Sequence, residues 1–259
     1  MNNKTYEITK GSAHFLEHRV MDFTKNIEAM EKINEYGSIV NAYTTYNGTN
    51  YNIFGHEKIL DNMTLLFDRV FNADIKDEDV ENERGIILEE YFMCLSNPYY
   101  ILETKCFSNL FNKSFIKYPV IGSEEGIKNV KGSELRRLYK DFYTPDNMFV
   151  VVTGDFNKDY TKDIKRSKSD IKVIKPKEEL KVNIPYEELK MNLNEEKICI
   201  AYKTDMPKKV DKIKKLGVNL NQIVPFYDLL GGDIRSNLVI PFLLALISST
   251  PLAISLIPG

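Results

Sequence analysis

The stretch "SIVNAYTTYNGTNYNIF", residues 38–54, constrains the fold more than any other part of the chain. It is rich in β-branched and aromatic residues, which favour strands. The Asn47-Gly48 pair in its middle is the strongest short-range signal for a hairpin. We therefore predict two antiparallel strands, at 38–46 and 49–54.

Helical patterns surround this hairpin. Apolar residues recur at helical spacing, or capping residues mark helix ends, in five segments: 12–22, 26–37, 57–71, 77–97 and 132–143. Two further segments predict strands: a buried one at Phe149–Val152, ending at Gly154, and "KICIAYKT" at 197–204. Strands mixed with helices predict an α+β fold, with a mostly antiparallel sheet on which helices pack.

Composition excludes several classes of function. The net charge of the 259 residues is −2, so charge favours no nucleic-acid partner. The three cysteines are odd in number and lack paired spacing, which argues against a disulfide framework and a thiolate metal site. The first residues lack the apolar core of a signal peptide. We expect a cytoplasmic protein in a reducing compartment.

The chain contains three histidines, and two of them lie four residues apart in "GSAHFLEHRVMDF". On a helix, His14, Glu17 and His18 project from one face. Two imidazoles one turn apart can chelate Zn²⁺, and a neighbouring carboxylate can act on water at the metal. The order H-x-x-E-H is the inverted zincin pattern. The plainer alternative is a pair of helix-face histidines beside a solvated glutamate, and His56 is expected to be structural or exposed.

A candidate third ligand lies in "ENERGIILEEYF", since catalytic zinc usually has three protein ligands. Glu83 and Glu90 are two helical turns apart and share a face, whereas Glu89 points about 100° away from Glu90. A merely charged helix face is the alternative here.

Together these segments resemble the insulinase/pitrilysin family of zinc peptidases, on the strength of "GSAHFLEH", the Asn-Ala-Tyr-Thr strand and "ERGIILEE". The resemblance implies that His14, His18 and Glu90 hold zinc. It implies that Glu17 is the general base and that Glu83 supports the site without binding the metal. It also implies a metallopeptidase-type α/β sandwich, with the first domain near complete and the second partial.

Other segments extend the resemblance. "GSIVNAYTTYNGTNY" is similar to the family's substrate-binding edge strand, which implies that Asn41 and Ala42 bind an extended peptide through backbone pairing. A plain hairpin strand is the rival interpretation. "YPVIGSEEGIKNV" and "FYTPDNMFVVVTGDF" match the rest of the first domain, and "FYDLLGGDIRSNL" matches the start of the second.

These observations predict a division of the chain into a zinc peptidase domain at 1–160, a charged linker at 161–195 and a truncated second domain with an apolar tail at 196–259. The expected function is a zinc-dependent endopeptidase that cleaves peptides or unfolded segments. We expect a second peptidase half or a homologous partner chain to complete it. The alternatives are a truncated, non-catalytic family member and a membrane-attached binding subunit of a two-chain peptidase.

The tail "LVIPFLLALISSTPLAISLI", residues 238–257, carries no charge. As a helix its 20 residues would span about 30 Å, which matches the core of a bilayer. Three interpretations stay open: an anchor that makes the protein membrane-associated, a core segment of the second domain, and a tail without an evolved role.

Overall fold

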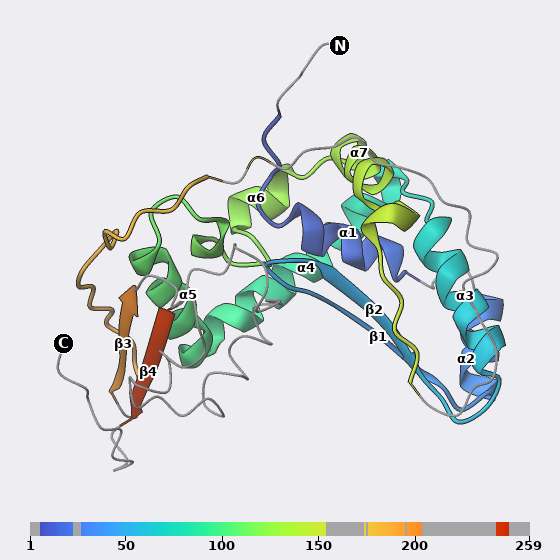
Figure 1. The fold of residues 1–259 in the computed structure, drawn as a ribbon, viewed down its shortest axis with the longest axis horizontal. Coiled ribbons are helices and arrows are strands. Elements are labelled where there is room, and N and C mark those ends of the chain that lie inside the picture. The colour runs from blue at the N-terminus through green and yellow to red at the C-terminus, as the bar shows by residue number, and fades with distance from the viewer. Residues whose placement is uncertain are drawn as a thin grey trace. The chain divides into compact units, whose positions relative to one another are not determined.

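The computed structural model describes residues 6–22, 27–153, 174, 176–194, 196–203 and 242–248. The chain forms two compact units, and each is described by itself. The first unit comprises residues 1–44, 49–90 and 120–174, and the second comprises 45–48, 91–119 and 175–259. The described residues form a mixed α+β fold that is mostly helical, with two small antiparallel sheets (Figure 1).

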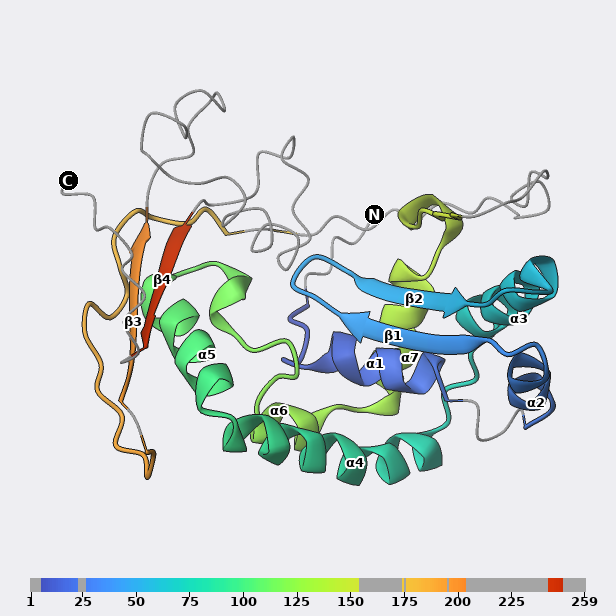
Figure 2. The ribbon, with the colours of Figure 1, turned by 90° about the horizontal axis from the view of Figure 1, so that it is seen from below.

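The first unit contains the predicted hairpin. Strands β1 (Ile39–Thr44) and β2 (Thr49–Phe54) pair antiparallel, with Ala42 opposite Tyr51. Three helices contact this two-stranded ribbon (Figure 2). They are α1 (Ser12–Val20), α2 (Ile27–Glu35) and α3 (Ile59–Phe71).

Three more α-helices lie in this unit: α4 (Asp77–Ser96), of which residues 77–90 belong here, α6 (Glu124–Asn129) and α7 (Gly132–Phe142). A short 3₁₀ helix follows at Pro145–Asn147. The helices expected at 77–97 and 132–143 are confirmed, whereas α6 was not predicted. Helices α6 and α7 pack against α1. Phe15 and Val20 of α1 are fully buried, as are Ile87 of α4 and Leu135 of α7. Burial of this kind is the main source of stability for such a core. The hydroxyl groups of Tyr51 and Tyr143, 2.5 Å apart, join β2 to the end of α7.

The strand predicted at Phe149–Val152 is wrong. Residues 148–153 have no regular secondary structure, and the exposed fractions of Phe149 and Val151 are 88% and 71%. An apolar run forms a strand only when another strand offers it a hydrogen-bonding ladder, and this segment pairs with neither β1 nor β2. The sheet of the first unit therefore has two described strands, fewer than we expected.

The second unit contains α5 (Pro98–Leu110), a short 3₁₀ helix at Phe115–Lys117, and the antiparallel strands β3 (Lys197–Lys203) and β4 (Phe242–Ser248). The strand predicted at 197–204 is confirmed. Phe107, Leu110 and Phe111 form the core of this unit, with Val182 and Ala201 packed against them.

The tail contains strand β4 at Phe242–Ser248, so these residues do not form the helix that one of the three open interpretations, the membrane anchor, requires. Pairing with β3 agrees with the interpretation as a core segment. None of the helices in the described ranges has the length and apolar character needed to cross a membrane. The segment "FYDLLGGDIRSNL" and residues 161–173 of the expected linker lie outside the described residues.

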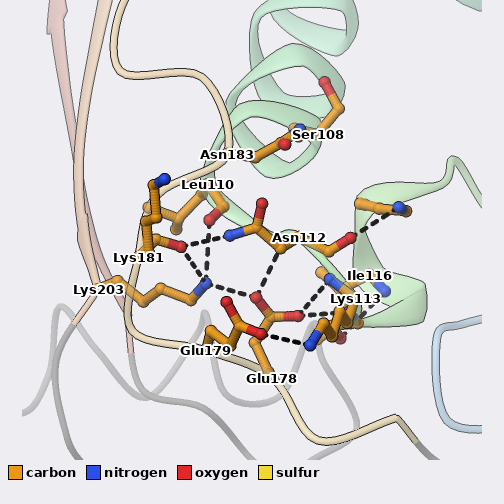
Figure 3. A network of polar contacts seen from close by, with 12 residues as sticks. Ser108, Leu110, Asn112, Lys113, Ile116, Glu178, Glu179, Lys181, Asn183 and Lys203 are labelled. Atoms are coloured by element: carbon orange, nitrogen blue, oxygen red, sulfur yellow. Dashed lines mark hydrogen bonds and ion pairs between the residues drawn. The ribbon is translucent and has the colours of Figure 1, made fainter.

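The described part of the expected linker, residues 176–194, is irregular but firmly held in the second unit (Figure 3). Glu178 accepts hydrogen bonds from the backbone amides of Asn112, Lys113 and Ser114. Its carboxylate also lies 2.6 Å from Lys203 Nζ, and the two side chains are only 2% and 1% exposed. Burial raises the pKa of Glu178, but Lys203 and these amides outweigh that effect and hold the pKa at about 2.

Candidate metal centre

Helix α1 carries the paired histidines, and a tight contact fixes its beginning. Gly11 precedes the helix with φ +91°, and a Cβ atom there would lie 2.5 Å from Ile121 O. Only glycine adopts this conformation without strain while allowing so close an approach. The start of α1 is thereby pinned against the segment before α6, which sets the rotation of the helix.

Three side chains converge on one point. His14 Nε2 lies 3.6 Å from Glu90 Oε1, and His18 Nε2 lies 3.3 Å from Glu90 Oε2. One ligand atom from each of the three residues lies within 4.8 Å of the others. Because two metal–ligand bonds of about 2.1 Å at a tetrahedral angle separate their ligand atoms by about 3.4 Å, the spacing suits zinc.

The donor set suits a cation. An unprotonated imidazole nitrogen and a carboxylate oxygen are both acceptors, so their approach is favourable only if a proton or a metal ion lies between them. The histidines lower the pKa of Glu90 below its ordinary value, first through His14 and then through His18. The Glu90 side chain is one-third exposed, which leaves one side of the group open to solvent.

Glu83 contacts His18 from the side away from Glu90. Its Oε1 lies 2.9 Å from His18 Nδ1, while His18 Nε2 faces Glu90. Burial lowers the pKa of His18, but Glu83 and Glu90 outweigh it and raise this pKa to about 9. A carboxylate on one ring nitrogen fixes the orientation in which the other nitrogen can bind a metal.

Glu17 is buried, with an exposed fraction of 7%, on the same helix as the histidines. Thr44 of β1 donates a hydrogen bond of 2.5 Å from Oγ1 to Glu17 Oε2. One oxygen of this carboxylate is therefore held by the hairpin.

Asn41 and Ala42 lie in β1, outside the cluster around Glu90. Ala42 N–H donates to Asn41 Oδ1 at 2.9 Å, although Ala42 stands opposite Tyr51 in the ladder. An extended peptide that used this amide would have to displace the Asn41 side chain. Glu89 is exposed on α4, in keeping with its expected helical phase.

Sequence reasoning missed two residues of this region, Thr44 and Arg19. Arg19 directly follows His18, is 3% exposed, and contacts Glu83. Arg19 offered no signal, because the residues between Phe15 and Val20 already include Glu17 and His18, so a further charge does not stand out. Thr44 offered none, because a threonine is ordinary in a strand.

An H-x-x-E-H helix facing a glutamate on a second helix defines a candidate zinc centre of the inverted zincin type. Sequence profiles agree with this class: that of the insulinase family, peptidase family M16, matches residues 5–124, and that of the M16 inactive domain matches residues 129–221. The chain belongs to the M16 insulinase family, and it covers the N-terminal domain and part of the inactive domain.

Curated relatives are zinc proteases. The uncharacterised zinc protease YmxG of Bacillus subtilis is 28% identical over 172 residues, which is 63% of this chain and 41% of the relative. An uncharacterised zinc protease from Mycobacterium leprae is 32% identical over 157 residues, which is 58% of this chain and 34% of the relative. The chain thus spans less than half the length of these relatives.

Solved structures share the fold. A protein of Alicyclobacillus acidocaldarius described as M16-like superposes with a TM-score of 0.72 at 23% identity, covering 78% of this chain and 50% of that one. A protease from Helicobacter pylori gives a TM-score of 0.63 at 22% identity, covering 81% of this chain and 55% of that one. The fold of the described residues is therefore M16-like.

Proposed function

We propose that this chain is the metal-binding half of a zinc-dependent endopeptidase, with a metallopeptidase-type α/β sandwich as its complete form. The observation that carries the proposal is the convergence of His14, His18 and Glu90 within 4.8 Å. The family relationship supports it, because the curated relatives are zinc proteases.

Zinc is the metal that fits these residues. Two imidazoles and one carboxylate form a ligand set that zinc enzymes use, and such sites keep a further position open. When bound, zinc supplies Lewis-acid polarisation of a carbonyl group and a water that is acidic near neutral pH. His14, His18 and Glu90 would hold it, and Glu83 would keep His18 oriented.

Glu17 would act as the general base. It lies on α1 between the two histidines, and Thr44 occupies its Oε2, so Oε1 can accept the proton of the attacking water. The same carboxylic acid would then deliver the proton to the leaving amine. A fixed carboxylate does not have to reorient during the reaction.

The substrate class follows from β1. Asn41 and Ala42 would pair with an extended peptide through the backbone, a mode that tolerates many side chains. Peptides and unfolded segments present such a backbone, whereas folded proteins do not. The length of the relatives supports a further requirement, namely a second homologous half or partner chain that completes the substrate site.

The Glu17→Gln variant tests the proposal. Glutamine keeps the shape but cannot accept the proton, and general-base catalysis contributes about 10²–10⁴-fold. In a preparation where the wild-type chain hydrolyses a peptide, the variant should bind zinc equally and lose at least about 100-fold in hydrolysis. Unchanged hydrolysis would remove Glu17 from the mechanism.

A further inference from the structure

We propose that Arg19 is a positioning residue of the metal centre: it holds Glu83 so that Glu83 holds His18 in its metal-binding orientation. The inference rests on the proposed zinc site. It concerns a side chain that contacts none of the candidate ligands and that the H-x-x-E-H pattern does not include.

Arg19 is buried among three carboxylates. Its Nη1 lies 3.0 Å from Glu83 Oε2, and its Nη2 lies 2.6 Å from Asp22 Oδ2 and 3.9 Å from Asp79 Oδ2. The side chains of Arg19, Asp22 and Asp79 are 4%, 11% and 7% exposed. The guanidinium group therefore has little room to move to an alternative position.

The helices explain why these groups meet. Asp79 and Glu83 are one turn apart on α4, so their carboxylates share a face. Arg19 follows His18 on α1, about 100° further around the helix. Glu83 of α4 thus contacts α1 at two side chains, His18 and Arg19.

Glu83 divides its two oxygens between these neighbours. Oε1 faces His18 Nδ1 at 2.9 Å and Oε2 faces Arg19 Nη1 at 3.0 Å. A carboxylate bonded at one oxygen alone can rotate about its last torsion, which is broad in energy. The contact with Arg19 suppresses this rotation and so fixes the hydrogen bond that orients the imidazole.

Charge alone predicts the opposite effect. A cation close to a metal site repels the metal, so its removal should strengthen zinc binding. Loss of an outer partner of a ligating histidine typically weakens metal binding about 10–100-fold. The sign of the change therefore separates positioning from a simple field effect.

The experiment measures Zn²⁺ affinity by competition with a chromogenic chelator, at fixed pH and salt, on the full chain. We expect Arg19→Met to weaken binding about 10-fold or more, and Arg19→Lys to fall between this variant and the wild type, because an ammonium group lacks the planar fork. Arg69→Met is the matched control, since Arg69 also supports α1, donating to the backbone oxygens of Val20 at 3.0 Å and of Arg19 at 3.5 Å. It should leave zinc affinity nearly unchanged.

A double-mutant cycle with Glu83→Gln tests the route of the effect. If Arg19 acts through Glu83, Arg19→Met should cause little further loss of affinity in the Glu83→Gln background. Circular dichroism of the metal-free variants checks folding. If Arg19→Met does not fold, Arg19→Lys carries the same comparison.

Three results would overturn the inference: zinc binding by Arg19→Met as tight as that of the wild type or tighter, fully additive losses in the cycle, or an equal loss in Arg69→Met. A wild-type chain that binds no zinc would overturn the proposed function, and this inference with it. If only the prediction for Arg19→Met fails and the wild-type chain binds zinc, the proposed zinc site still stands.

Discussion

At the scale of single residues, helical phase assigns three glutamates of α4 to different tasks. Glu90 faces both histidines, Glu83 faces only His18 of the two, and Glu89 is exposed. We predict that Glu90→Gln weakens zinc binding severely, that Glu83→Gln weakens it about 10–100-fold, and that Glu89→Gln has little effect. Chelator competition on the three variants gives the ranking. A larger loss for Glu89→Gln than for Glu90→Gln would contradict the geometry.

Thr44 provides a second prediction at this scale. Its hydrogen bond to Glu17 ends on a charged group, and such bonds contribute about 1.5–3 kcal/mol. Thr44→Val keeps the shape and removes the donor, so we expect kcat to fall about 10-fold at equal zinc content. Thr44→Ser keeps the hydroxyl group and should restore most of the loss. Equal kcat in the valine and serine variants would show that the hydrogen bond does not contribute.

The residues of the candidate centre could be predicted because they come in pairs that each lie within one helix. His14 and His18 are one turn apart, Glu83 and Glu90 are two, and the family resemblance joins the two helices. Arg19 and Thr44 could not be assigned in the same way. Their partners lie on other elements, and a sequence does not state which elements meet.

At the scale of elements, the same limit explains the strand that was predicted and not found. The apolar run at Phe149–Val152 has the composition of a buried strand, yet a strand exists only through its neighbour. The hairpin at β1 and β2 needed no such information, because Asn47-Gly48 brings its two strands together locally. The prediction at 161–195 was a charged linker, whereas Glu178 in its described part is buried against Lys203.

Glu178 leads to a prediction of pH dependence. Its folded pKa of about 2 is below the ordinary value of 4.5. Its contribution to stability is therefore complete above about pH 4.5 and is lost as the pH falls toward 2. We expect the thermal midpoint of unfolding to fall over this range. In Glu178→Gln the fall should be smaller, from a midpoint already lowered at pH 7, because removing one partner of a buried ion pair costs about 3–5 kcal/mol.

Glu179→Gln is the control for this experiment. Glu179 adjoins Glu178 and pairs with Lys113, but both side chains are about half exposed. Exposed pairs contribute about 0–1 kcal/mol, so the control should unfold like the wild type. Identical pH profiles for the wild type and Glu178→Gln would show that Glu178 does not carry the acid sensitivity.

At the scale of the whole molecule, the chain spans less than half the length of its relatives, and the first unit alone contains the complete candidate centre. We therefore predict that metal binding and hydrolysis separate. The purified chain should bind zinc by itself but hydrolyse peptides poorly without a second half. Size-exclusion chromatography followed by a peptide cleavage assay on each fraction measures both the oligomeric state and the hydrolytic activity. Efficient hydrolysis by a monodisperse monomer would show that one half suffices.

The central claim is that His14, His18 and Glu90 together hold one zinc ion. The most direct test is the zinc content of the purified chain after equilibration with buffered free zinc, measured by inductively coupled plasma mass spectrometry. The account predicts about one zinc ion per chain, and close to none in a variant with both His14→Ala and His18→Ala. A wild-type chain without zinc, or a double variant that retains as much zinc as the wild type, would contradict it.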